Sequence, residues 1–181
     1  MTETEQTRRL TVFADGRQIA AGPEPQIAVH LLARLADPDL APPVVIDDAT
    51  GRSVDIDLRQ ATTVAPKPGR GRPRLGVVAR EVTLLPRQWD WLASQPGGAS
   101  VALRRLVDEA RRASRDSDRE RRARDAAYHA MSVLAGDLPG FEEASRALFN
   151  GDSAAFRAQI SGWPQDVTAY LHRLLSDRPE D

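Results

Sequence analysis

The chain has no cysteine among its 181 residues. Without thiols it can form no disulfide framework, no thiolate metal site and no cysteine nucleophile. Such a chain suits a reducing compartment, so we expect a cytoplasmic protein. Its first residues lack the positive charge and apolar stretch of a signal peptide, and no run reaches the roughly 18 apolar residues of a membrane span. The sequence therefore predicts a protein that is neither exported nor embedded in a membrane.

Lysine is almost absent, because Lys67 is the only lysine among the 25 basic residues. The 26 acidic residues bring the net charge to −1, but the segment from Lys67 to Arg80 has five positive charges and no negative one. Arginine binds phosphates and guanine edges with a planar fork that lysine lacks, which favours nucleic acid as a partner. A compositional bias of the source genome explains the arginine content equally well.

The pattern of residues 1–60 predicts a small ββαββ domain in an α+β protein. Asp15-Gly16 is typical of a hairpin turn, and apolar residues recur at helical spacing from Ile27 to Leu35 before Asp37-Pro38 ends the helix. The strands that we expect are Leu10–Ala14, Arg17–Ala21, Val44–Ile46 and Ser53–Leu58.

Three further segments follow. Residues 61–76 are rich in proline, glycine and arginine and form a basic arm with almost nothing to bury. Residues 77–112 predict a strand over Val78–Leu85, a helix from Pro86 through Gln95, and a helix that Ser100 caps and that ends near Arg112. Residues 113–181 predict a helical region that contains the aromatic residues Phe141, Phe149, Phe156 and Trp163 in its core.

Arg70-Gly71-Arg72-Pro73, in the middle of the arm, resembles the core of the AT-hook, an element that binds the minor groove of A·T-rich DNA. Glycine lets the backbone approach the floor of the groove, arginine matches its negative potential, and proline keeps the chain extended. The resemblance implies that Arg70 and Arg72 enter the groove. Lys67, Arg74 and Arg80 would then contact phosphates.

The segment after the arm resembles the ribbon-helix-helix fold of small bacterial repressors and antitoxins. The matching parts are Arg80–Leu85, a helix with Trp89 and Leu92, and Gly98-Ala99-Ser100 before a second helix. The resemblance implies a homodimer through residues 78–112, with Thr83 facing DNA and Ser100 near the phosphates. Glu81 and Leu85 depart from the family's pattern, because neither suits a surface held against DNA. The alternative is that this segment is one strand and two helices of a larger core.

A longer set of motifs resembles a bacterial protein family of unknown function. The motifs are Gly71–Gly76, Leu84–Leu92, Gly97–Ser100 and Ala135–Glu143. This resemblance spans most of the chain and implies no activity.

An enzyme is the less favoured interpretation. His129 is the best candidate base, because Tyr128 adjoins it and Asp125 lies one turn earlier, but no nucleophile, phosphate loop or second ligand accompanies it. The other candidates are His30, His172, Asp137, Glu142 and Glu143, and the aspartates Asp47, Asp48, Asp55 and Asp57 form an acidic patch that we expect to be a solvated face. We therefore expect no catalytic residue, no metal site and no cofactor.

Together these patterns predict a DNA-binding protein, either a transcriptional regulator or an antitoxin-like repressor. Its residues 1–60 would serve as a sensor or partner-binding module. The alternative is a protein-interaction or regulatory module whose basic arm binds an acidic partner surface.

Overall fold

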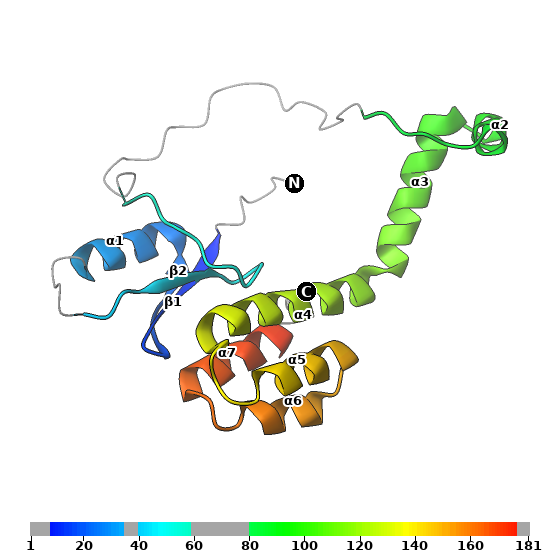
Figure 1. The fold of residues 1–181 in the computed structure, drawn as a ribbon. Helices are drawn as coiled ribbons and strands as arrows, with labels where there is room; N and C mark the ends of the chain where they lie inside the picture. Colours follow the sequence, from blue (N-terminus) through cyan, green and yellow to red (C-terminus); the bar gives the residue numbers. More distant parts are fainter. Residues whose placement is uncertain (1–7, 35–39, 59–79, 177–181) are drawn as a thin grey trace. The chain divides into compact units, whose positions relative to one another are not determined.

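The computed structural model describes residues 8–34, 40–58 and 80–176, and these residues form both helices and strands (Figure 1). This confirms the predicted mixture of α and β structure. The elements are, in order, β1 (Arg9–Ala14), β2 (Arg17–Pro23), α1 (Glu24–Arg34), β3 (Val44–Asp47), α2 (Pro86–Ser94), α3 (Gly98–Ala113), α4 (Arg115–Ala135), α5 (Phe141–Asn150), α6 (Ser153–Ile160) and α7 (Gln165–Ser176).

The chain divides into two compact units. Met1–Val64 and Arg119–Asp181 form the first, and Ala65–Asp118 form the second. The first unit therefore brings together segments from both ends of the sequence. Within the described ranges, no helix combines the length and apolar character that crossing a membrane requires.

The sheet of the first unit is antiparallel, with strand order β2-β1-β3. The β1–β2 hairpin turns at Asp15 and Gly16, which have φ values of 49° and 73°. Two consecutive positive φ values are the geometry of the tight hairpin turn that an Asp-Gly pair favours. The local sequence thus specifies this hairpin.

The expected strand over Ser53–Leu58 is not a strand. Only an isolated bridge joins Ser53 to Ile46, and the backbone of Val54 donates one hydrogen bond to the carbonyl of Val45 at 2.9 Å. Val54, Ile56 and Leu58 nevertheless pack on the same apolar cluster as β1 and α1. The alternation of apolar residues marks a face packed on the core, but it does not require a continued ladder of hydrogen bonds.

Both faces of the sheet are covered. Leu10 and Val12 of β1 belong to a cluster with Ile27 and Leu31 of α1. Phe13 and Ile46 belong to a second cluster with residues of α4 to α7, including Met131, Phe156, Val167, Tyr170 and Leu171. Successive residues of a strand point to opposite faces, so β1 contributes to both clusters and is buried along most of its length.

The turn after β3 makes a very close contact with α4. Gly51 has a φ of 66°, and a Cβ at this position would overlap the backbone carbonyl of Ala126. A glycine is therefore required here both for the backbone conformation and for the approach of α4.

The C-terminal helices begin and end at residues whose conformation suits those positions. Gly151 takes a left-handed conformation after α5, and Asp152 caps α6 by accepting a hydrogen bond from the Ala155 amide at 2.9 Å. Phe156 and Trp163 are buried, and the indole of Trp163 donates to the carbonyl of Pro139 at 2.9 Å. The expectation for Phe149 is wrong, because its side chain is half exposed. Its ring lies 5.2 Å from that of Tyr128.

Candidate interaction surface

Most of the predicted DNA-contacting residues lie outside the described part of the chain: Lys67, Arg70, Gly71, Arg72, Pro73 and Arg74. Arg80, Thr83 and Ser100 are described, and all three are exposed. They belong to the second unit, whose described residues run from Arg80 to Asp118.

The expected strand over Val78–Leu85 is not formed in its described part. Residues 80–85 carry no β structure, and α2 then begins at Pro86 as predicted. Among the described residues, this segment pairs with no strand. The Leu85 amide instead donates to the side chain of Gln88 at 2.8 Å, which satisfies one donor at the start of α2.

Ser100 does not cap the second helix. That helix, α3, begins at Gly98 after Gly97, which has a φ of 84°. Ser100 is therefore the third residue of the helix and lies exposed on its first turn. The two glycines allow the chain to enter the helix earlier than the serine predicts.

Apolar residues follow one face of α3 at helical spacing: Ala99, Ala102, Leu103, Leu106, Val107 and Ala110. Ala102 is buried and Leu103 partly so, since α2 packs beside the beginning of α3 (Figure 1). Leu106, Val107 and Ala110 are exposed, and Val107 retains 54% of its accessible surface. We call these three residues the uncovered stripe.

The length of α2 explains why the stripe is uncovered. The helix has nine residues and is about 13 Å long, whereas α3 has 16 residues and is about 24 Å long. The second unit buries only Leu92 and Ala102 among its described apolar residues. Two tryptophans of α2, Trp89 and Trp91, are also 41% and 49% exposed. This helix pair has more apolar surface than it can cover by itself.

The histidines do not assemble a catalytic site in the described residues. His129 Nε2 lies 3.3 Å from a guanidinium nitrogen of Arg52, and its ring lies 5.9 Å from that of Tyr128. His30 is exposed on α1, whereas His172 is partly buried on α7. No group of three or more histidine, aspartate or glutamate residues in the described ranges is placed to hold a metal ion.

Two residues of the predicted acidic patch are structural. Asp48 accepts hydrogen bonds from the hydroxyls of Thr11 at 2.7 Å and Tyr170 at 3.0 Å, and Arg173 lies 3.7 Å from its other oxygen. Asp47 accepts from Arg8 at 2.8 Å. The patch is therefore not the uniform solvated face that the sequence suggests. Asp48 connects Thr11 of β1 with Tyr170 and Arg173 of α7, and Asp47 pairs with Arg8.

Tyr170 is the most perturbed group of this network. Burial, together with the negative charge of Asp48 and the hydrogen bond to it, raises the pKa of Tyr170 far above its usual value of 10. The guanidinium of Arg173 lies 5.0 Å from the centre of the tyrosine ring and opposes this shift. A phenol held neutral in this way is a hydrogen-bond donor that fixes α7 on the sheet.

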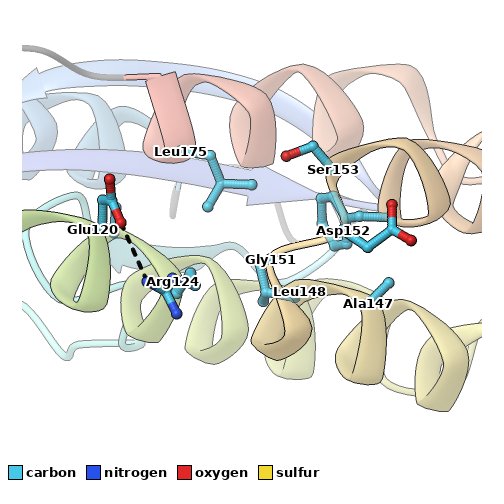
Figure 2. A pocket seen from close by; sticks show the side chains of 10 residues that line it. Glu120, Arg124, Ala147, Leu148, Gly151, Asp152, Ser153 and Leu175 are labelled. Carbon is cyan, nitrogen blue, oxygen red and sulfur yellow. Dashed lines mark ion pairs between the residues drawn. The ribbon is translucent and has the colours of Figure 1, made fainter. Parts of the chain in front are cut away.

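A pocket of about 280 Å³ opens between α4, α5, α6 and the end of α7 (Figure 2). Figure 2 shows Glu120 and Arg124 together on α4, with Asp152 and Ser153 at the opposite end of the pocket. Glu120 and Arg124 form an ion pair at 3.5 Å, and Asp152 is engaged as the cap of α6. Each charged group of this lining already has an intramolecular partner, which makes the pocket a poor catalytic site.

The sequence matches one known protein family over most of its length. Residues 9–175 match the family described as an uncharacterized protein conserved in bacteria (DUF2239). The chain belongs to this family. Comparisons with curated proteins and with solved structures give no match. Membership of DUF2239 confirms the resemblance to a bacterial family of unknown function and adds no activity to the surfaces described above.

Proposed function

We propose that this DUF2239 protein is a homodimeric DNA-binding protein, either a transcriptional regulator or an antitoxin-like repressor. The observation that carries the proposal is the uncovered stripe on α3, which follows an arginine-rich segment in the same unit. The stripe would hold two copies together, and each copy would contribute one basic arm.

The uncovered stripe could pair with itself in a second copy. In an antiparallel pair of α3 helices with a two-fold axis near Val107, the stripe of one copy would pack against the stripe of the other. A two-fold symmetric interface joins the same patch of both copies in this way.

The residues before α2 fit the same dimer. Residues 80–85 pair with no strand in the described part of the chain, and in the ribbon-helix-helix arrangement the corresponding strands pair across the two-fold axis. The proposal assigns Thr83 to the outer face of that ribbon and Arg80 and Ser100 to phosphate contacts.

The arm supplies the sequence preference. Arg70 and Arg72 would enter the narrow minor groove of A·T-rich DNA, with Gly71 and Pro73 shaping the backbone and with Lys67 and Arg74 on phosphates. Two arms held by one dimer bind with a high effective concentration at the second site, so two weak contacts give one stable complex.

The test is fluorescence anisotropy with A·T-rich and G·C-rich duplexes over a salt series. We expect tighter binding to the A·T-rich duplex, and the double substitution Arg70→Ala/Arg72→Ala should remove this preference. It should also flatten the slope of log K against log salt by about 0.9 for each lost phosphate contact. The matched control is Arg146→Ala/Arg157→Ala, which removes the same charge from exposed positions on α5 and α6.

Equal binding by the arm variant and the wild type would remove the arm from the mechanism. Failure of the wild type to bind either duplex, combined with arm-dependent binding to poly-glutamate, would instead support the alternative of an acidic protein partner.

A further inference from the structure

The first unit contains a second, more apolar cavity of about 460 Å³, between the end of α1, the loop before β3 and residues 53–58. Ten of its 13 lining residues are aliphatic or proline. Leu31, Val45 and Ile56 belong to this apolar lining, and so do Pro42 and Pro43. Proline restricts the backbone, which limits how far this part of the lining can rearrange.

One guanidinium stands in this apolar lining. Arg34, in the last turn of α1, donates from Nη2 to the carbonyl of Ala41 at 2.9 Å. Its Nε is buried and has no hydrogen-bond partner within residues 8–34, 40–58 and 80–176. Asp55 is the acidic residue of this lining. Within the described residues, Arg34 forms no ion pair with it. A buried donor without an acceptor costs free energy, and a charged one costs more.

We infer that this cavity is a binding site for a small organic monocarboxylate with an aliphatic body. The carboxylate would accept from the guanidinium of Arg34, because a charge-assisted hydrogen bond between guanidinium and carboxylate is among the strongest that a side chain makes. The aliphatic body would lie against Leu31, Val45 and Ile56. The volume falls in the range of about 300–1,000 Å³ that is usual for small-molecule sites.

The chemistry of the lining selects against other ligand classes. A phosphate or a dicarboxylate would bring more charge than one guanidinium neutralises, and most of the wall offers no polar partner. A neutral hydrocarbon would fill the wall but form no charge-assisted hydrogen bond with Arg34. A single carboxylate on an aliphatic chain satisfies both parts of the cavity.

The experiment is isothermal titration calorimetry of the full chain with three probes: octanoate, 1-octanol and acetate. Octanoate should bind more tightly than 1-octanol by at least tenfold, and acetate should not bind measurably. Arg34→Gln should weaken octanoate binding at least tenfold and leave 1-octanol binding unchanged. The control Arg157→Gln removes an exposed arginine from α6 and should bind octanoate as the wild type does.

A second variant keeps the test valid if Arg34→Gln fails to fold. Ile56→Trp adds volume to the wall, leaves Arg34 intact, and should reduce the binding of both octanoate and 1-octanol. Undetectable octanoate binding to the wild type, or equal octanoate affinity in wild type and folded Arg34→Gln, would overturn the inference. The experiment uses no DNA, so its failure is separate from a failure of the proposed DNA binding.

Discussion

At the scale of single residues, Gly51 leaves less room for a Cβ atom than any other described glycine. It has a positive φ and faces the backbone of Ala126, which cannot move as a flexible side chain could. The close packing of α4 on the turn after β3 therefore requires a residue without a Cβ atom at position 51.

We expect Gly51→Ala to lower the free energy of unfolding by at least about 2 kcal/mol, because it adds an overlap with α4 to the strain of a positive φ. Urea denaturation measures the change. The matched control is Gly151→Ala, since Gly151 has a φ of 72° but open space around it. That variant should lose only about 1 kcal/mol. A similar loss in both variants would show that the contact with Ala126 is unimportant.

Tyr170 gives a prediction about alkaline pH. Burial and the contact with Asp48 raise the pKa of its phenol in the folded protein above the usual value of 10. The unfolded chain then releases this proton at a lower pH than the folded chain does. Its contribution to stability is complete below pH 10 and is lost as the pH rises above that value.

Urea denaturation between pH 9 and 11 tests this. Wild type should lose stability more steeply above pH 10 than Tyr170→Phe, by up to about 1.4 kcal/mol per pH unit. The chain suits the measurement, because it has no cysteine, one lysine and two tyrosines to titrate in this range. Tyr128→Phe is the control and should keep the wild-type slope. Parallel curves for wild type and Tyr170→Phe would contradict the prediction.

At the scale of elements, α3 is too long for the helix that packs on it. Its apolar face continues beyond the part that α2 covers, and Leu106 is the first residue of the uncovered stripe. An isolated apolar side chain on a surface needs no explanation, but three on one helical face mark a contact surface.

Leu106→Glu should convert the proposed dimer to a monomer, because two glutamates would meet near the two-fold axis without a counter-charge. Light scattering after size exclusion measures the mass. Val133→Glu is the control: Val133 is 46% exposed on α4 in the other unit, and its substitution should leave the mass unchanged. A wild-type monomer at micromolar concentration would contradict the proposed dimer and the ribbon with it.

The elements also show what local patterns can predict. Asp15-Gly16 specifies its hairpin because the turn depends on two adjacent residues, and Gly151 ends α5 for the same reason. The alternation over Ser53–Leu58 correctly predicts which face packs on the core. It wrongly predicts a strand, because a ladder of hydrogen bonds also needs a neighbouring strand in register. The start of α3 differs from the prediction, because the positive φ of Gly97 lets the helix begin at Gly98 and not after Ser100.

At the scale of the whole molecule, the contacts that build the first unit join residues far apart in the sequence. The Gln18 amide donates to Asp166 at 2.9 Å, and the ring of Phe13 packs against Tyr170 at 5.2 Å. Periodicity is a local signal and contains no information about which segments meet. For this reason neither the partners of Asp48 nor the Arg34 cavity could be predicted from the sequence.

The same long-range contacts predict that the second unit can be removed. Phe13 and Ile46 share one apolar cluster with α4 to α7, so the first unit needs segments from both ends of the chain. None of the buried residues of that cluster comes from Ala65–Asp118. Replacing Ala65–Asp118 by a flexible Gly-Ser linker should leave a monomer that melts cooperatively by circular dichroism and still binds octanoate. It should not bind either duplex.

The matched control is residues 1–64 alone, which lack the partners of Phe13 and should not melt cooperatively. Loss of cooperative melting in the linker variant would mean that the second unit is part of the folding core, and dimerisation and DNA contact would then have to be sought elsewhere in the chain.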